Sequence, residues 1–128
     1  MVFQREHLAD RRASDTGSSK PLKPAVFHIL LALAARDNYG YAVMQAVRRA
    51  SDGHVTLSPG SFYRHLARLI EEGLVLELTE RRAGDDPRRG SYYRLTAAGH
   101  GVLAAERRRL AALVAAIDGL RVPRRGPA

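Results

Sequence analysis

Hydrophobic residues recur at helical spacing between Ser58 and Gly73, with polar residues between them. This pattern predicts an amphipathic helix with one buried stripe and one basic face. Ser58 is a suitable N-cap, Pro59 suits the first helical position, and Gly73 is the predicted stop. The apolar stripe consists of Phe62, Leu66, Leu69 and Ile70, and the opposite side carries Ser61, Arg64, His65 and Arg68. An ordinary surface helix has the same pattern, so its function must be argued from its neighbours.

Two helices are predicted before this segment. Residues 22–36 are apolar almost all the way round, which predicts burial on more than one side. In so small a domain, the second buried side suggests another interface, for example with a second subunit. Residues 39–50 are predicted to form an amphipathic helix, and residues 54–57 are a candidate short strand.

A β-hairpin is predicted after the amphipathic helix. From Leu74 to Arg82, leucines at every second position alternate with other residues, a pattern typical of a half-buried strand. Residues 83–90 are rich in turn formers, and Ser91 to Leu95 form the second strand. The predicted hairpin is rich in arginine and has two acidic residues near its tip. These are Arg81, Arg82, Arg88, Arg89 and Arg94, with Asp85 and Asp86.

The last predicted helix runs from Ala97 to about Leu120, with Thr96 as its cap. Leucine or isoleucine repeats every seven residues at Leu103, Leu110 and Ile117, and Leu113 and Leu120 follow three residues after the last two. This is an a/d seam of about three heptads, which favours dimerisation. Glu106 occupies one d position, where it weakens the seam or sets its register. The alternative is a helix that packs only on its own domain.

Length and composition predict one globular domain. The chain has 128 residues, of which 45% are hydrophobic and 27% are charged. Cysteine is absent, which excludes a disulfide framework and a thiolate metal site and fits a cytoplasmic location. The longest apolar run, Pro24 to Ala35, is too short to span a bilayer, and the polar first residues do not form a secretory signal. No membrane association is expected.

The charge favours a polyanionic partner. The net charge is +8 and the isoelectric point is about 10.8, which points to nucleic acid first and an acidic membrane second. The order of the elements predicts a mainly α fold with a small β-hairpin, a winged helix-turn-helix followed by a dimerisation helix. In that fold the third helix reads the major groove of double-stranded DNA and the hairpin reaches the backbone or the minor groove.

Four domain segments follow from this interpretation. They are a flexible N-terminal arm (1–20), a DNA-binding winged helix-turn-helix domain (21–96), a C-terminal dimerisation helix (97–121) and a tail (122–128).

Four local motifs occur in a characteristic order. They are Tyr39-Gly40-Tyr41, the run from Leu57 to Tyr63, the run from Leu69 to Val75, and the run from Tyr92 to Gly99. Together they resemble the PadR family of bacterial transcriptional regulators, specifically its shorter branch with a single C-terminal helix. The resemblance implies a homodimeric repressor whose last helix contacts the partner's first helix, with a small-molecule effector near that interface. The chain has no tryptophan, which disfavours an aromatic sandwich around a planar ligand.

The candidate DNA-binding residues are Ser58, Gly60, Ser61, Tyr63, Arg64, Arg68, Arg88 and Arg89. Gly60 is either a site of close phosphate approach or a simple helix-start glycine, and Tyr63 either contacts phosphate or covers the edge of the core. Arg64 and Arg68 suit guanine or, more often, phosphate. The alternative interpretation of Arg88 and Arg89 is a run of charged side chains that are simply solvated. The candidate dimer interface comprises Phe27, Leu31, Leu103, Leu110, Leu113, Ile117 and Leu120.

Catalytic and metal chemistry are not expected. The five histidines lack metal-ligand spacing, and neither a P-loop nor a nucleophile elbow is present. We therefore predict no enzyme activity, no metal and no cofactor. The alternatives to a sequence-specific regulator are a winged-helix protein-interaction module and a nonspecific DNA-binding protein.

Overall fold

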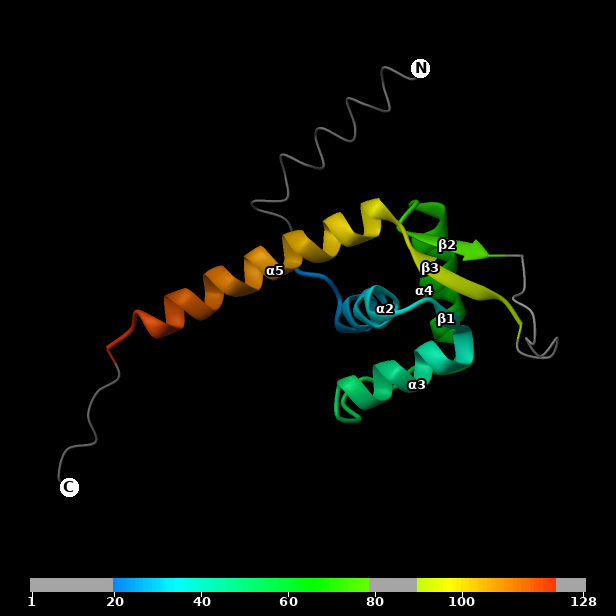
Figure 1. Cartoon of the computed structure of the whole chain (residues 1–128). Helices are drawn as coiled ribbons and strands as arrows, with labels where there is room; N and C mark the ends of the chain where they lie inside the picture. The colour runs from blue at the N-terminus through cyan, green and yellow to red at the C-terminus, as the bar shows by residue number, and fades with distance from the viewer. Residues whose placement is uncertain (1–19, 79–89, 122–128) are drawn as a thin grey trace, which may run out of the picture. The chain divides into compact units, whose positions relative to one another are not determined.

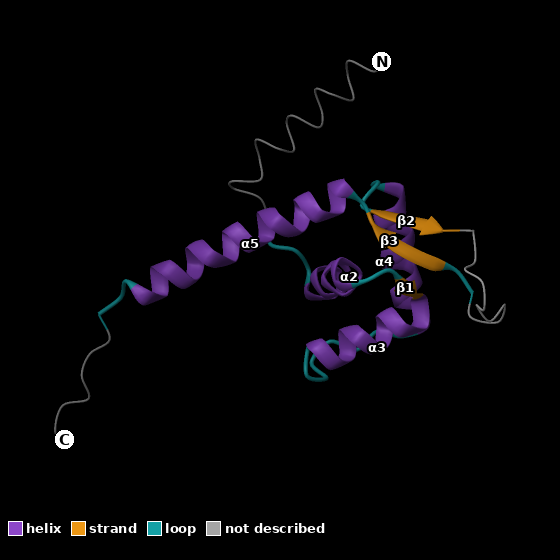
Figure 2. Cartoon of the chain, viewed as in Figure 1, coloured by secondary structure: helices purple, strands orange, loops and turns teal. Residues whose placement is uncertain are grey.

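The computed structural model describes residues 20–78 and 90–121. Its elements, in chain order, are α2 (Pro24–Ala35), β1 (Asn38–Tyr39), α3 (Gly40–Ala50), α4 (Pro59–Glu71), β2 (Val75–Leu78), β3 (Tyr92–Leu95) and α5 (Ala97–Asp118) (Figures 1 and 2). Helices predominate and the strands form one small antiparallel sheet, which confirms the predicted fold class. Residues Leu22–Ala104 form one compact unit, and the described residues from Ala105 onward belong to a second.

The core of the first unit lies where three helices meet the sheet. Helix α2 packs on α3 and on β3, and α4 packs on β2. Much of the apolar circumference of α2 is thereby used within one subunit, because Ile29, Leu30 and Leu33 are buried there. The largest fully buried side chains are Phe62, Ile29, Leu30, Leu66, Val43 and Val47. Burial of each contributes roughly 1.5–3 kcal/mol.

Helix α4 begins and ends where its local sequence predicts. The Ser58 hydroxyl oxygen accepts a hydrogen bond from the Ser61 backbone N–H at 3.2 Å, a cap worth about 1 kcal/mol. At the other end, Gly73 has φ of +78°. The backbone N–H of Leu74 donates to the Leu69 carbonyl at 2.9 Å, which closes a Schellman turn. The predicted stripe is buried at Phe62, Leu66 and Leu69.

The short strand predicted at residues 54–57 is wrong. The Ser51 hydroxyl instead bonds both the N–H and the carbonyl of Val55, at 3.0 and 3.2 Å, which ties this backbone into a turn. The third strand is β1, which follows α2 and pairs antiparallel with β3 through Asn38↔Tyr93 and Tyr39↔Tyr92. Two residues carry no readable period, so only tertiary pairing defines this strand.

Strand β2 turns a different face to the core from the one that its leucines indicate. Val75 is 2% exposed, whereas Leu76 is 48% exposed. Leu76 pairs with Arg94 of β3, on the face away from the buried Val75. The side that packs on the core is therefore the one that bears Val75. The remainder of the predicted strand, from Thr79 to Arg82, lies outside the described residues.

An ion pair fastens the end of α2 to the sheet. Arg94 donates to Asp37 Oδ2 from Nε at 3.0 Å and from Nη2 at 2.8 Å. These hydrogen bonds raise the pKa of the Arg94 guanidinium above its ordinary value. Both side chains are partly exposed, so the contact serves mainly to orient β3.

The first turn of α5 is tied to the turn that ends α4. The Thr96 hydroxyl accepts from the Gly99 N–H at 3.1 Å, which confirms the predicted cap, and donates to the Gly73 carbonyl at 2.7 Å. The Thr96 backbone N–H donates to the Leu74 carbonyl at 3.0 Å. Gly99 lies directly against that carbonyl and the Leu95 side chain, so a Cβ at this position has no room.

Gly99→Ala is expected to lower the free energy of unfolding by about 1–3 kcal/mol, because the added methyl group meets a fixed backbone oxygen. Gly101→Ala is the matched control, since a Cβ there meets nothing within 4 Å. Alanine should stabilise this helical position by about 0.5–1 kcal/mol. Chemical denaturation measures both effects, and equal stability of the two variants would contradict the close packing of Gly99.

Candidate nucleic-acid interface

The basic face of α4 is available to a partner. Arg64 and Arg68 lie one turn apart and are both exposed, on the side opposite the buried Phe62. Arg68 Nε stands 3.7 Å from Glu72 Oε1, with the two side chains 80% and 43% exposed. Such a surface pair contributes about 0–1 kcal/mol. Arg68 can therefore exchange it for a phosphate or a base at little cost.

The start of α4 offers open space and polar hydrogens. Ser58 uses its hydroxyl oxygen as an acceptor in the cap, which leaves the hydroxyl hydrogen for a partner. Gly60 is exposed, and a Cβ there meets nothing within 4 Å. The missing side chain is therefore not required by packing inside the subunit. Free N–H groups and the helix dipole favour an anion at this end.

Tyr63 covers the edge of the core. A Cβ at Gly40 would lie 2.6 Å from the Tyr63 hydroxyl oxygen, so the ring occupies the space that this glycine leaves. The ring also packs edge-to-face on Phe62 at a centroid distance of 5.0 Å. Tyr63 nevertheless remains 45% exposed. Its packing role leaves part of the ring for a partner.

The base of the predicted wing is anchored by Tyr93. This residue is 6% exposed and belongs to the core cluster. Burial raises the pKa of its phenol, against the effect of a hydrogen bond with Ser91. The phenol stays protonated at neutral pH and holds β3 in place. Arg81, Arg82, Arg88 and Arg89 lie outside the described residues, so the predicted wing contacts remain a prediction.

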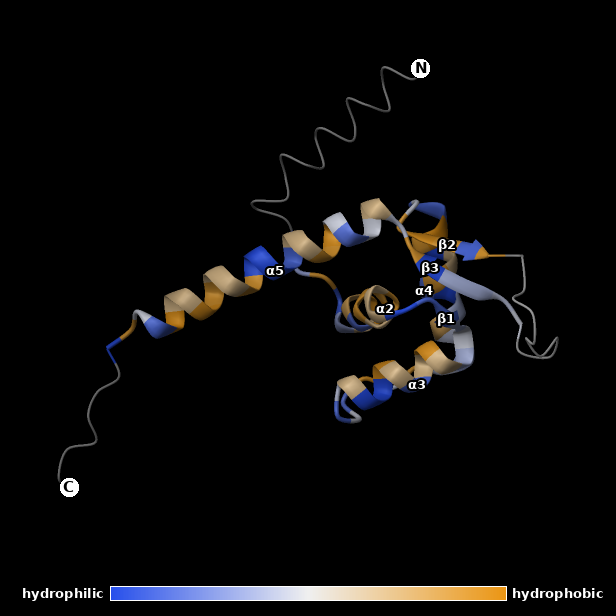
Figure 3. Ribbon diagram, viewed as in Figure 1, coloured by the Kyte–Doolittle hydropathy of each residue, from blue (hydrophilic) through white to orange (hydrophobic). Residues whose placement is uncertain are grey.

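The second half of α5 carries an exposed apolar face. Leu110, Leu113, Ile117 and Leu120 are 38%, 50%, 64% and 68% exposed, and Figure 3 shows this part of α5 as largely hydrophobic. Val114, at 55% exposure, extends the face beyond the a/d positions that the heptad pattern selects. Leu103 is half-buried and packs against the core, as the first turns of α5 require. On α2, Leu31 is 40% exposed and Phe27 is half-buried.

Glu106 is buried and forms an ion pair on the next turn of α5. It is 6% exposed, and both of its oxygens accept from Arg109, at 2.7 and 2.8 Å. This hydrogen bonding raises the pKa of Arg109. A bidentate partner explains how an acidic side chain occupies a seam position.

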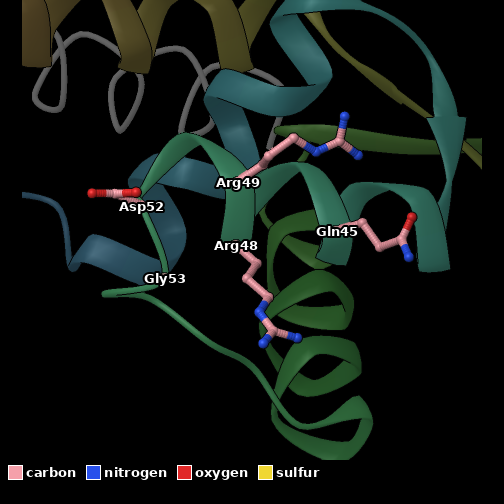
Figure 4. A pocket seen from close by; sticks show the side chains of 5 residues that line it. All are labelled: Gln45, Arg48, Arg49, Asp52 and Gly53. Atoms are coloured by element: carbon pink, nitrogen blue, oxygen red, sulfur yellow. The ribbon is translucent and has the colours of Figure 1, made fainter.

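Helix α3 bears a basic surface that sequence reasoning did not select. An open concavity of about 400 Å³ is lined by Gln45, Arg48, Arg49, Asp52 and Gly53 (Figure 4). A second, of about 270 Å³, shares Gln45 and Arg48 and reaches the residues just before and at the start of α4. The helical spacing of residues 39–50 puts Gln45, Arg48 and Arg49 on the polar side of the predicted amphipathic helix and assigns them no role. Only the fold places two of them, Gln45 and Arg48, beside the start of α4.

Two absences concern the part of the chain that the structure describes. There, His, Asp and Glu side chains do not gather into a group that could hold a metal ion. In the same ranges, no helix combines the length and the apolar character that a bilayer crossing needs.

The arrangement defines a class. A three-stranded antiparallel sheet packs with three helices, of which α4 is capped and has an exposed basic face, and this arrangement is a winged helix-turn-helix. The model of the transcriptional regulator PadR-like family matches residues 29–105, and the chain belongs to that family. This confirms the resemblance seen in the four motifs. The protein is thus a DNA-binding transcriptional regulator.

Solved structures share the fold. A transcriptional regulator from Clostridium thermocellum is 23% identical with a TM-score of 0.58, covering 76% of this chain and 92% of its own. A PadR family regulator from Clostridium difficile is 23% identical with a TM-score of 0.61, covering 75% and 96%. A Streptococcus mutans protein is 24% identical with a TM-score of 0.60, covering 80% and 97%. No curated protein matches the chain.

Gly60→Ala is expected to weaken DNA binding by about 1–2 kcal/mol, because the methyl group fills space that a phosphate would use. Stability should stay equal or rise, since the methyl group meets nothing within 4 Å inside the protein. Fluorescence anisotropy with a labelled duplex, together with thermal unfolding, measures the two effects. Gly101→Ala, at an exposed glycine within α5, is the control. Unchanged DNA affinity of Gly60→Ala would rule out the backbone approach.

Proposed function

We propose that this chain is a cytoplasmic, homodimeric repressor that binds a pseudo-palindromic operator with one α4 per half-site. The observation that carries the proposal is the division of α4 into a buried stripe and a free basic face. Phe62, Leu66 and Leu69 fix the helix on the core, so Arg64 and Arg68 are presented from a rigid element. A rigid reading helix loses little conformational freedom on binding.

In this proposal the two arginines of α4 supply most of the sequence preference. Each has the length and the planar donor set to bind guanine O6 and N7, which is worth about 1–3 kcal/mol of discrimination. A phosphate contact by either one would add affinity without preference. Four residues would hold the start of α4 on the DNA backbone, namely Ser58, Gly60, Ser61 and Tyr63. The predicted wing would add contacts through Arg88 and Arg89.

The proposed dimer forms through α5, with residues 97–121 as the dimerisation segment and residues 21–96 as the DNA-binding domain. The support is the exposed face of Leu110, Leu113, Ile117 and Leu120, because apolar surface of this extent usually has a partner. Phe27 and Leu31 of α2 are the proposed counterpart on the other subunit. Leu103 would extend the face toward the core.

The repression would respond to a small molecule. A ligand that binds near the dimer interface changes the separation of the two α4 helices if it favours one dimer geometry over another. Two helices reading one face of the duplex need half-sites about 34–36 Å apart. A small change in the separation of the two α4 helices would prevent one of them from contacting its half-site.

Selection from a random pool of DNA duplexes tests the reading helix. The wild-type protein should enrich an inverted repeat with half-sites about one helical turn apart. Arg64→Glu with Arg68→Glu should lower affinity for it at least about 100-fold, because two attractive charges become repulsive. Arg107→Glu with Arg108→Glu, at exposed positions of α5, makes the same charge change as a control.

The rival functions give different results in that selection. Retention of duplexes without enrichment would indicate a nonspecific DNA-binding protein. Failure of the wild-type protein to retain any duplex, with no effect of the α4 reversal, would indicate a protein-interaction module. Either result overturns the proposed function.

Leu113→Glu with Ile117→Glu is expected to convert the dimer to monomer, weakening dimerisation at least about 100-fold, because the interface cannot pair buried carboxylates. Sedimentation equilibrium at micromolar concentration measures this. Both side chains are at least half exposed, so the subunit should remain folded. The charge-matched control is Arg107→Gln with Arg108→Gln. A wild-type monomer, or a dimer that survives both glutamates, would refute the assignment of α5.

A further inference from the structure

A groove runs between the exposed side of α3 and the start of α4. We call it the α3–α4 groove; its lining includes Tyr41, Gln45 and Arg48 from α3 and Thr56, Leu57 and Pro59 from the segment that opens α4. It encloses about 270 Å³. Pro59 is the first residue of α4, so the groove is continuous with the end of α4 where N–H groups are free. None of the groove residues belongs to the candidate set derived from the sequence.

Arg48 is the cation of this groove. It is exposed, and within residues 20–78 and 90–121 it forms no ion pair with a carboxylate. Its backbone is fixed, because the Arg48 carbonyl accepts from the Gly53 N–H at 2.8 Å. Figure 4 shows Arg48 and Arg49 extending to different sides of α3. Arg49 lines only the larger concavity, which also contains the acidic Asp52.

Hydroxyl groups complete the donor set. Gln45 Nε2 donates to the Tyr41 hydroxyl oxygen at 3.1 Å, so the oxygen serves as an acceptor there and the hydroxyl hydrogen is left to donate to a partner. Tyr41 is 66% exposed. Thr56, from the segment that opens α4, is exposed and also lines the groove. One guanidinium and two hydroxyls in one open groove match the oxygens of a phosphate.

We propose that the α3–α4 groove seats one phosphate of the DNA backbone, on the flank of the bases that α4 reads. The proposal rests on the proposed function. It follows from position: the N-terminal residues of a recognition helix reach the base edges, while the preceding helix crosses the backbone. Leu57 and Pro59 give the groove an apolar wall, which offers a base edge no hydrogen bond. The groove thus adds affinity and fixes the orientation of α4 without reading sequence.

The test compares Arg48→Ala with Arg49→Ala on a selected duplex and on an unrelated duplex of equal length, titrated over a series of salt concentrations. Arg48→Ala should bind both duplexes roughly tenfold more weakly at low salt. The plot of log affinity against log salt concentration should become less steep, by about 0.9 per subunit, because one phosphate contact is lost. The ratio of the two affinities should not change. Arg49→Ala, its neighbour on α3, should change affinity less than about twofold.

Arg48→Lys separates a phosphate contact from base reading. Lysine keeps the point charge, so this variant should recover most of the salt slope, whereas a bidentate base contact would not survive the exchange. Arg48 is exposed, and thermal unfolding of all three variants should match the wild type. A mutant whose stability falls is replaced in the comparison by Arg48→Gln, which removes the charge but keeps a polar end and the first three carbons of the side chain.

Three results would overturn the assignment of the α3–α4 groove as a phosphate site while leaving the proposed function intact. They are an unchanged salt slope in Arg48→Ala, an equal loss in Arg49→Ala, and a loss confined to the selected duplex. The proposed function fails separately, when the wild-type protein shows no preference between the two duplexes. In that case the slope comparison on either duplex still decides whether Arg48 holds a phosphate.

Discussion

The packing of one stripe of α4 on the core is the contact on which the other functional features depend. Phe62, Leu66 and Leu69 are almost completely buried, and they fix both the position and the rotation of the helix. With rotation fixed, the opposite side has to face solvent, and that side is basic. Tyr63 extends the contact by filling the space beside Gly40. A weaker core contact would leave the arginines attached to a helix without a defined orientation.

Local signals allowed α4 and the start of α5 to be predicted from sequence. The caps at Ser58 and Thr96 and the glycine stop at Gly73 act within a few residues, so their chemistry is readable without a fold. Strand β1 was not predictable, because its two residues are a strand only through pairing with β3. The exposure of Leu76 was missed for a related reason, since the packing of the whole sheet decides which face is buried.

The residues of the candidate site also fall into those that local sequence patterns reveal and those that only the fold reveals. Arg64 and Arg68 could be selected from sequence because a helical stripe implies an opposite face. Arg48 could not, because its relevance comes from lying beside the first residue of α4, and the path of residues 51–58 that brings the two together is not readable from the sequence pattern. Val114 was missed because the heptad rule selects two positions per repeat, whereas the exposed apolar face is wider. The candidate DNA-binding surface and the proposed association surface therefore combine short-range patterns with placements that only folding creates.

The tie between α4 and α5 has a consequence for how such a chain can evolve. Thr96 bonds the Gly73 and Leu74 carbonyls, and Gly99 rests on the second of them. The turn that ends α4 and the cap that begins α5 are thus closely packed and hydrogen-bonded to each other. A substitution that moves the backbone of either half must displace the other half as well. The two motifs should therefore be inherited as one unit, even though the entire hairpin separates them in the chain.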